Sequence, residues 1–217
     1  MKGDVVAVVC DNGEPNLANC IASLRRQTVS VRVVMASGPK TDLSLAGRLA
    51  DKVYPPISGI GRARVNAILK EDVDYIISCD SDCIYDERYI QYAIEDLERG
   101  AKAVKAGVIL PLDPSPLGLL ESMISPLIPY EFALAFKKPE FLKLGLAEEA
   151  EKAMDPRWDI GRRIVTGLNA TPDFRMMVYT RFPTYGMVYV ANNYAPSLLA
   201  GALVPGAVLA IVGASLQ

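Results

Sequence analysis

The 217-residue sequence contains no histidine. This absence excludes a Ser-His-Asp or Cys-His nucleophile and a histidine-ligated metal, so any proton transfer must use Asp, Glu, Lys, Tyr or Cys. Cysteines are also few, at four, and they form neither a CxxC pair nor the spacing of a secreted disulfide scaffold, which argues against a zinc site. Cys79 and Cys83 have no activating base beside them and are expected to be packing residues.

The sequence also lacks an excess of either positive or negative charge. The 23 Lys and Arg residues nearly balance the 25 Asp and Glu residues, the net charge is −2, and no nucleic-acid partner is expected. With 51% hydrophobic and 22% charged residues, the composition is that of a globular protein of one α/β domain, with or without an extension. The opening apolar run is too short and too close to acidic residues for a signal peptide, so a cytoplasmic protein is expected.

No charged residue follows Arg181. The segment 195–217 within this stretch has the length of a membrane span, which is about 20 residues. Its proline and glycines weaken that interpretation, and no Lys or Arg follows it to anchor an end. A buried or dimer-forming tail is therefore favoured, while contact with a membrane surface, which would make the protein peripheral to the membrane, stays open.

Apolar, β-branched runs alternate with helical patterns over the first half of the chain, which predicts a mostly parallel sheet with right-handed crossovers. Strands are expected at 4–10, 29–37, 73–80 and 101–110, with a short strand or an extended link at 51–56. Helices are expected at 14–27, 45–49 and 87–100, and the stretch 58–70 is expected to be Gly-rich at its start and then helical. Asp86 is expected to be the N-cap of the helix at 87–100. The less regular second half predicts a strand and short helix within 129–145, a helix at 156–168 and strands at 174–180 and 186–191.

Ligands of parallel sheets bind outside the carboxyl ends of the strands. The candidates at these ends are Asp11, Asn12, Ser37, Gly38 and the stretch Asp80-Ser81-Asp82. Residues two apart in an extended chain project to the same side, so the two carboxylates of Asp80 and Asp82 can face one ion. Mg²⁺ or Mn²⁺ commonly takes one or two carboxylates together with substrate phosphates and water. The alternative interpretation is a solvated acidic turn.

Two further stretches combine polar chemistry with a helix start. Gly61 lies in a Gly-rich stretch that leads into a helix carrying Arg64, an arrangement that attracts phosphate; a flexible turn with a solvated helix face is the alternative. Asp159 precedes Arg162 and Arg163 by three and four residues. It either pairs with them within its own helix or serves as a base directed at the cleft.

In their order and spacing these stretches resemble a family 2 glycosyltransferase with the GT-A fold, over roughly residues 4–182. The stretches that carry the resemblance are "SLRRQT" at 23–28, "SGIGRARVNAI" at 58–68, "YIISCDSDCIYDERYI" at 75–90, "LAFKKPEFLKLG" at 134–145 and "RWDIGRRIVTGL" at 157–168. The resemblance implies an α/β fold: a GT-A-type, Rossmann-like, mostly parallel sheet flanked by helices, with a smaller mixed C-terminal part. The implied glycosyltransferase domain covers 1–194, with a nucleotide-sugar-binding half at 1–110 and an acceptor-side half at 111–194, before the apolar tail 195–217.

The resemblance also implies an activity: inverting transfer of a sugar from a nucleotide-diphospho-sugar, with Mn²⁺ or Mg²⁺, to an acceptor hydroxyl or lipid phosphate. The acceptor is unknown and could belong to a glycan, a protein or a polyprenyl lipid. Carried over by position, the metal residues are Asp80 and Asp82, the nucleotide-sugar residues are Asp11, Asn12, Ser37, Gly61, Arg64 and Asp80, and the general base is Asp159. The sequence departs from the family's pattern where Ala36-Ser37 replaces an acid after the second strand, where Val65 replaces Asn, and where Trp158 replaces Glu.

Two other functions remain open from the sequence. A phosphatase of the haloacid dehalogenase type also places a D-x-D motif after an apolar strand, although normally after the first strand. A nucleotide-sugar-binding module that retains the fold without catalysis is compatible with the altered end of the second strand.

Overall fold

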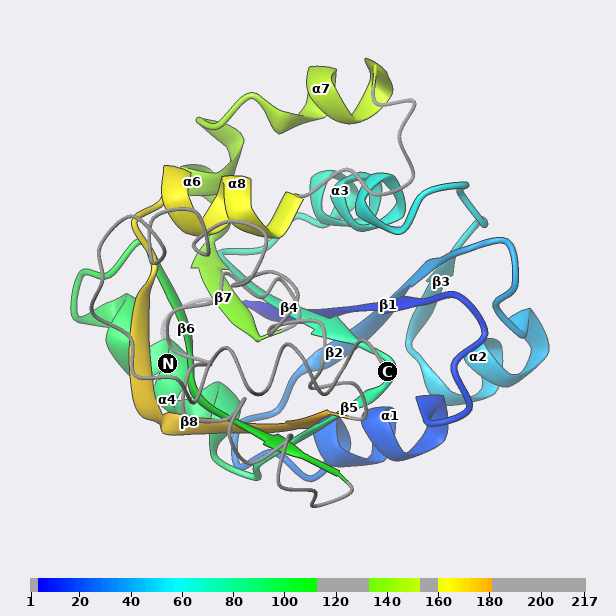
Figure 1. Ribbon diagram of the computed structural model, residues 1–217, viewed down its shortest axis with the longest axis horizontal. Helices are drawn as coiled ribbons and strands as arrows, with labels where there is room; N and C mark the ends of the chain where they lie inside the picture. Colours follow the sequence, from blue (N-terminus) through cyan, green and yellow to red (C-terminus); the bar gives the residue numbers. More distant parts are fainter. Residues whose placement is uncertain (1–3, 113–132, 153–159, 181–217) are drawn as a thin grey trace, which may run out of the picture.

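The computed structural model describes residues 4–112, 133–152 and 160–180 (Figure 1). The strands are β1 (Val5–Asp11), β2 (Arg32–Ser37), β3 (Lys52–Tyr54), β4 (Tyr75–Asp80), β5 (Cys83–Tyr85), β6 (Ala103–Pro111), β7 (Leu134–Lys137) and β8 (Thr171–Thr180). The helices are α1 (Leu17–Arg25), α2 (Leu43–Leu49), α3 (Ile60–Lys70), α4 (Tyr89–Glu98), α6 (Lys138–Leu142), α7 (Leu146–Lys152) and α8 (Ile160–Gly167). The described strands form one eight-stranded sheet in the order β3-β2-β1-β4-β7-β6-β8-β5.

The centre of the sheet is β1, which pairs in parallel with β2 on one side and β4 on the other. All seven residues of β1 are buried. Its side chains alternate between two separate hydrophobic clusters, with Val5, Ala7 and Val9 on one face and Val6, Val8 and Cys10 on the other. A strand covered on both faces needs apolar residues at every position, which is why this segment is continuously apolar in sequence.

Helices cover both faces of the sheet (Figure 1). The helices α1, α2 and α4 pack on the face that carries Val5, Ala7 and Val9. The helices α3, α6, α7 and α8 pack on the opposite face, where Phe136 and Phe141 stack with ring centroids 5.3 Å apart. The result is a three-layer α/β/α arrangement with its core on both sides of the sheet.

Antiparallel pairing begins beyond β4. Strand β7 lies between β4 and β6 and runs antiparallel to both, whereas β8 is parallel to β6 and antiparallel to β5. This part of the sheet curls away from the parallel part (Figure 1). The expected α/β fold, a mostly parallel sheet continued by a mixed C-terminal part, is confirmed. The expected halves 1–110 and 111–194 contribute neighbouring strands to this one sheet, because β7 inserts between two strands of the first half.

Most of the expected elements are present, with three differences. The three-residue strand β5 and the helix α7 are not predicted by the sequence patterns. The expected N-cap at Asp86 is wrong: α4 begins at Tyr89 with Arg88 as its N-cap, and the Asp86 carboxylate accepts a hydrogen bond from the Arg88 N–H at 3.0 Å. Local turn formation by Asp86 thus precedes the helix instead of capping it. The strand expected at 186–191 lies outside the described residues.

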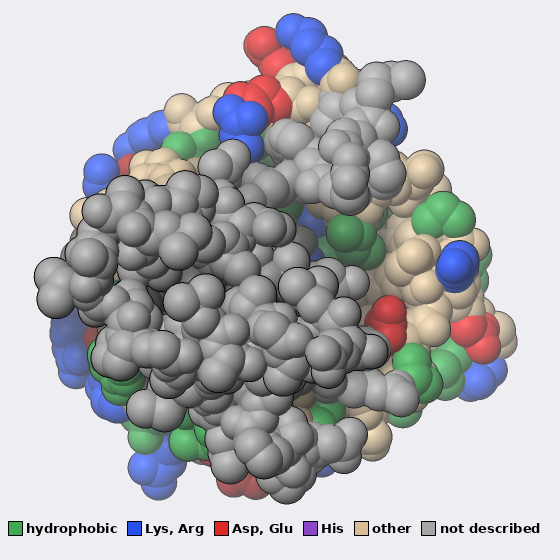
Figure 2. Space-filling view, in the orientation of Figure 1, with side chains coloured by type: hydrophobic (Ala, Val, Ile, Leu, Met, Phe, Trp, Pro, Cys, Tyr) green, Lys and Arg blue, Asp and Glu red, His purple; other side chains and the backbone are tan. Residues whose placement is uncertain are grey.

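Charges of both signs are interspersed on the described surface seen in Figure 2, for example over α7. There Glu149 forms an ion pair with Arg163 at 2.5 Å. Among the helices that the structure describes, none combines the length and apolar character needed to span a bilayer. The domain boundary expected at 194 and the apolar tail 195–217 lie outside the described residues.

Candidate functional site

Three expected site residues meet where neighbouring parallel strands end. Asp11 ends β1 and is the register partner of Ser37 at the end of β2. On the other side, Cys10 of β1 is the register partner of Asp80 at the end of β4. The sheet therefore brings the residues that follow β1, β2 and β4 together at the carboxyl ends of these strands, as the alternating sequence pattern predicts.

The carboxylate of Asp11 accepts its hydrogen bonds from other groups of the protein. Its side chain is buried, Oδ2 accepts a hydrogen bond from the Gly13 N–H at 3.0 Å, and Oδ1 accepts from the Glu14 N–H at 3.1 Å. The hydroxyl of Ser81 also donates to Oδ1, at 2.6 Å. These three donors satisfy most of the acceptor capacity of the carboxylate. Asp11 thus joins the loop after β1 to the turn after β4, while its expected contact with a nucleotide stays a prediction.

The loops after β1 and β2 are held against each other. The Asp11 carbonyl accepts hydrogen bonds from the Gly38 N–H and the Thr41 hydroxyl, both at 2.7 Å. The exposed Asn12 side chain accepts from the Lys40 N–H at 3.2 Å. Ser37 is completely buried, and its hydroxyl has no hydrogen-bond partner within the described part of the chain. Of the expected site residues Asp11, Asn12 and Ser37, Asn12 is the one whose side chain is exposed and could reach a ligand.

Asp80 is paired with a buried arginine. Arg64 projects from α3, is fully buried, and donates hydrogen bonds to the Ser78 hydroxyl at 2.5 Å and to Oδ1 of the Asp80 carboxylate. The Asp80 side chain retains 28% of its accessible surface, so it is partly exposed to solvent at the carboxyl end of β4. Gly61, one turn before Arg64 in α3, is also buried. In this geometry Arg64 contacts one of the expected metal carboxylates, and its expected contact with a nucleotide stays a prediction.

Asp82 lies in the turn between β4 and β5. Burial, and then the negative charge of Asp80, raise the pKa of the Asp82 carboxyl to about 6. The hydrogen bond from the Cys83 thiol to Oδ1 of Asp82, at 3.3 Å, acts against this shift and lowers the pKa of Asp82. Burial and the nearby Asp80 carboxylate both disfavour the charged form of Asp82, and a bound cation would neutralise this negative charge.

A divalent cation fits this pair of oxygen donors if it shares its shell with another ligand. Within the described ranges no group of three or more His, Cys, Asp or Glu side chains is arranged to hold a metal ion. Mg²⁺ and Mn²⁺ are commonly held by one or two carboxylates, and substrate phosphates and water supply the remaining ligands. Asp80 and Asp82 therefore suit an ion that binds together with a phosphorylated substrate.

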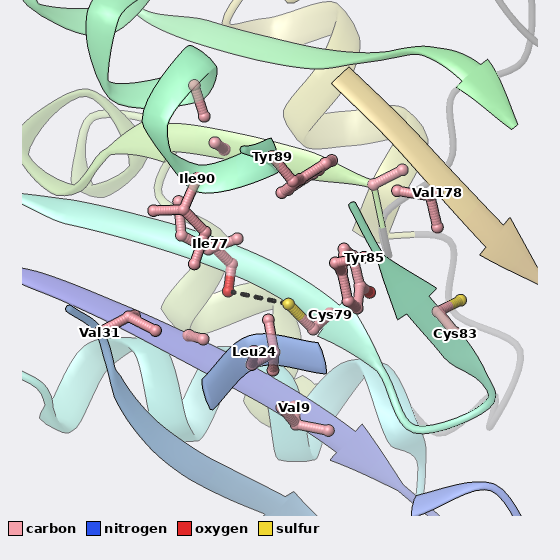
Figure 3. Close-up of a cluster of buried hydrophobic side chains, with 14 of the residues drawn as sticks. Val9, Leu24, Val31, Ile77, Cys79, Cys83, Tyr85, Tyr89, Ile90 and Val178 are labelled. Atoms are coloured by element: carbon pink, nitrogen blue, oxygen red, sulfur yellow. Dashed lines mark hydrogen bonds between the residues drawn. The ribbon is translucent and has the colours of Figure 1, made fainter. Parts of the chain in front are cut away.

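The turn from Asp80 to Asp82 rests on a buried cluster of thiols and aromatic rings (Figure 3). The Cys20 thiol donates to the Asp80 carbonyl at 3.3 Å, and the Asp80 N–H donates to the Tyr85 hydroxyl at 3.1 Å. Cys79 points into the cluster, where its thiol lies 3.8 Å from the Ile77 carbonyl (Figure 3). Burial raises the pKa of the Cys79 thiol to about 12, so it is a packing residue, as expected.

Several residues that support the site have no obvious signal in the sequence. Ser81 is the clearest case, because it stands between two acids and its role depends on Asp11, which lies far away in the chain. Alternation along an extended segment predicts only that the Ser81 side chain lies on the opposite side from those of Asp80 and Asp82. Cys20, which donates to the Asp80 carbonyl, and Tyr85, which accepts from the Asp80 N–H, could not be found in this way, because only the packing of α1 and β5 brings them next to the turn.

Asp159, the expected general base, lies outside the described residues. Helix α8 begins at Ile160, and Ile160, Ile164 and Val165 are buried in the core on the α3 side of the sheet. The helix expected at 156–168 is therefore present from Ile160 onward. The role of Asp159 stays a prediction.

The family follows from a comparison with known sequences. Residues 5–140 match the sequence model described as glycosyl transferase family 2, which is more than half of the chain. The chain belongs to glycosyl transferase family 2. A search of curated proteins gives no significant match. Family membership agrees with the resemblance carried by the D-x-D strand and the "SLRRQT" helix end, and it argues against a haloacid-dehalogenase-type phosphatase.

Solved structures of glycosyltransferases share the fold. S. aureus TarS superposes with a TM-score of 0.58 at 14% identity, covering 87% of this chain and 40% of TarS. TarS 1-349 in complex with UDP-GlcNAc gives a TM-score of 0.57 at 14% identity, covering 82% of this chain and 58% of that one. The mannosyltransferase PcManGT from Pyrobaculum calidifontis, in complex with GDP-Man and Mn2+, gives 0.55 at 15% identity, covering 87% and 60%. The chain thus spans less than two thirds of each of these structures, and the likeness is one of fold.

Proposed function

We propose that this chain is an inverting glycosyltransferase that moves a sugar from a nucleotide-diphospho-sugar to an acceptor hydroxyl or a lipid phosphate, with Mn²⁺ or Mg²⁺. The observation that carries the proposal is the pair Asp80 and Asp82 in the turn that follows a central parallel strand, with the pKa of Asp82 raised to about 6 by burial and by Asp80. The complexes of TarS with UDP-GlcNAc and of PcManGT with GDP-Man and Mn2+ support a donor of this class.

In this proposal Asp80 and Asp82 hold the divalent cation and, through it, the diphosphate of the donor. When bound, the cation offsets the negative charge that develops on the departing diphosphate. Arg64 keeps Asp80 in place and partly balances its charge, since its guanidinium is fixed between Ser78 and Asp80. In the proposed nucleotide-sugar site the exposed Asn12 would contact the ligand through its side chain, whereas the buried residues Ser37, Gly61 and Asp11 would shape and support the site.

The proposed chemistry is a single displacement. Asp159 accepts the proton of the acceptor hydroxyl while the acceptor oxygen bonds to the anomeric carbon. The bond from that carbon to the diphosphate oxygen breaks, and the nucleoside diphosphate leaves with the electron pair. Attack from the face opposite the leaving group inverts the configuration. Because the sequence has no histidine, a carboxylate is the fitting base for this step.

The acceptor is proposed only by class: a glycan or protein hydroxyl, or a polyprenyl phosphate. The proposed location is cytoplasmic, with the apolar tail 195–217 attaching the protein to a membrane surface or to a second copy. Deleting 195–217 tests the attachment directly. Loss of sedimentation with liposomes would support a membrane contact, and a change from dimer to monomer in solution would support a dimer contact.

A thermal-shift screen tests the donor and the metal together. Binding to the folded state raises the unfolding temperature, so a panel of UDP- and GDP-sugars should stabilise the protein, and more strongly with Mn²⁺. The double variant Asp80→Ala with Asp82→Ala should lose the Mn²⁺-dependent part. Asp86→Ala is the matched control, because Asp86 lies in the same stretch but its carboxylate accepts from the Arg88 N–H. An undiminished Mn²⁺ effect in the double variant would contradict the proposed metal site.

Turnover separates the enzyme from a binding module. Hydrolysis or transfer of the sugar that gives the largest thermal shift should require Mn²⁺ or Mg²⁺, and Asp159→Asn should lower turnover with little change in donor binding. Donor binding without any turnover across the panel would instead support a catalytically inactive nucleotide-sugar-binding module.

A further inference from the structure

Two buried thiols hold the two ends of the Asp80–Asp82 turn. At its start, the Cys20 thiol donates to the Asp80 carbonyl, and at its end, the Cys83 thiol donates to Oδ1 of the Asp82 carboxylate, both at 3.3 Å. Both cysteines are completely buried. Their hydrogen bonds therefore form away from bulk water, where a weak S–H donor meets less competition.

The turn depends on such side-chain contacts because it lies outside the sheet ladder. The strand β4 ends at Asp80 and β5 begins at Cys83, so the residues between them lack regular strand pairing. The Ser81 N–H donates to the Cys10 carbonyl at 3.0 Å, which fixes the middle of the turn. The orientation of the Asp82 carboxylate is left to contacts made by the carboxylate itself.

The two donors come from rigid elements. Cys20 lies in the middle of α1, and Cys83 is the register partner of Thr180 in the β5–β8 pair. A donor anchored in this way fixes the oxygen that it binds, which leaves the other carboxylate oxygen of Asp82 in a defined direction. Groups that bind metal ions must be held within fractions of an ångström by their surroundings.

We propose that Cys20 and Cys83 are positioning residues, which orient the turn so that Asp80 and Asp82 present their free oxygens to a divalent cation. This inference rests on the proposed function, because it assigns the two cysteines a role toward the cation that Asp80 and Asp82 hold. The thiols act through the acids and do not ligate the ion themselves. Replacement by alanine removes the donor, whereas replacement by serine preserves one.

Mn²⁺ binding measures this role without any assay of activity. The electron paramagnetic resonance signal of free Mn²⁺ is titrated with the full chain, with Mn²⁺ alone and with UDP or GDP added. Cys83→Ala and Cys20→Ala should each weaken Mn²⁺ binding roughly three- to tenfold, as expected for the loss of one hydrogen bond. Cys83→Ser and Cys20→Ser should recover most of the affinity.

Cys79→Ala is the matched control. It removes a thiol from the same buried cluster, but the Cys79 thiol lies 3.8 Å from the Ile77 carbonyl and beside the Tyr85 hydroxyl, whereas the thiols of Cys20 and Cys83 contact atoms of Asp80 and Asp82 directly. Its Mn²⁺ affinity should equal that of the wild-type protein, even where its unfolding temperature falls. Equal affinity in the wild-type protein, Cys83→Ala and Cys20→Ala would overturn the inference and leave the proposed function standing. No Mn²⁺ binding by the wild-type protein under any of these conditions would overturn the metal site and the inference together.

An infrared measurement on the wild-type protein guards against variants that fold poorly. The S–H stretching band of Cys83, identified by its loss in Cys83→Ser, should shift on addition of Mn²⁺, because the acceptor carboxylate gains a positive charge beside it. A Cys83 band that stays unchanged at saturating Mn²⁺ would overturn the role of this thiol.

Discussion

The hydroxyl of Ser81 donates a hydrogen bond of 2.6 Å to Oδ1 of Asp11, 70 residues earlier in the chain. This contact joins the end of β1 to the turn that carries the proposed metal ligands. Because the Asp11 carboxylate also accepts the Gly13 and Glu14 N–H groups, one buried side chain organises two loops at the same edge.

Removing this carboxylate should destabilise the protein and loosen the turn. Asp11→Ala leaves the buried Ser81 hydroxyl and the part-buried Gly13 and Glu14 N–H groups without their acceptor. A buried unsatisfied group costs about 1–3 kcal/mol, and the two N–H groups add less because water can partly replace the lost carboxylate. We expect a total loss of about 2–4 kcal/mol in the free energy of unfolding, measured by urea denaturation. Asn12→Ala, which removes an exposed hydrogen bond next to it, should cost less than about 1 kcal/mol. Equal losses for the two variants would contradict the organising role of Asp11.

Two glycines should respond to alanine in opposite directions. Gly13 has φ = +91°, and a Cβ there would lie 2.8 Å from the Lys40 carbonyl oxygen. Gly13→Ala should therefore lower the free energy of unfolding by about 1–3 kcal/mol. Gly47 lies within α2, and a Cβ there meets no atom within 4 Å. Gly47→Ala should raise the free energy of unfolding by about 0.5–1 kcal/mol, since alanine favours the helix. Thermal and urea denaturation both report the sign, and destabilisation by Gly47→Ala would contradict the described helix.

Glu71, a buried acid at the C-terminal end of α3, should make the free energy of unfolding depend on pH. Glu71 accepts hydrogen bonds from Arg32, Tyr54 and Lys52, the last at 3.1 Å, and its side chain is only 2% exposed. Burial alone would raise the pKa of Glu71, but the hydrogen bonds from Tyr54, Arg32 and Lys52 outweigh it and lower the pKa below its usual value.

A lowered pKa stabilises the folded state above the pKa of the unfolded chain, about 4.3, and this contribution is lost as the pH falls from there through the folded pKa. The wild-type protein should therefore exceed Glu71→Gln in free energy of unfolding by a constant amount from pH 5 to 7, and by less as the pH falls below about 4. Urea midpoints at each pH measure the difference. Asp72→Asn, at an exposed neighbouring position, controls for the change in net charge. A difference that stays constant down to pH 3 would contradict the cluster.

The thiols around the turn should be unreactive in the folded protein. Burial raises the pKa of Cys79 to about 12 and raises those of Cys20 and Cys83 well above their usual value. Thiolate is the reactive form, so all three should resist Ellman's reagent at pH 8 and react quickly once urea unfolds the chain. Rapid labelling of Cys83 under native conditions would show that the turn opens and would argue against its role in positioning Asp82.

The sequence predicts elements where one local pattern is long enough to be read. The segment that forms β1 is apolar at each of six positions before Asp11, and the helical spacing of α4 is equally clear. The strand β5 has only three residues, too few to show an alternating pattern. The insertion of β7 between β4 and β6 depends on pairing between distant residues, such as Ile76 with Phe136, which no local pattern encodes.

The site shows the same division. The position of Asp80 and Asp82 at the end of a central strand follows from the sequence, because a buried strand must end where acids appear. The hydrogen-bond partner of each acid does not follow from the sequence, because the fold supplies it. These partners are Ser81 for Asp11, Arg64 for Asp80 and Cys83 for Asp82. The metal, nucleotide and base roles stay predictions.

The strand order has a consequence for synthesis on the ribosome. One edge of β4 stays unpaired until β7, which begins at Leu134, has been synthesised. Both edges of β6 stay unpaired until β7 and β8 have been synthesised. A nascent chain that has emerged only as far as residue 110 thus exposes several unpaired strand edges, which are templates for pairing with other chains. The protein cannot complete its sheet one half at a time, and its early strands need protection until the last ones arrive.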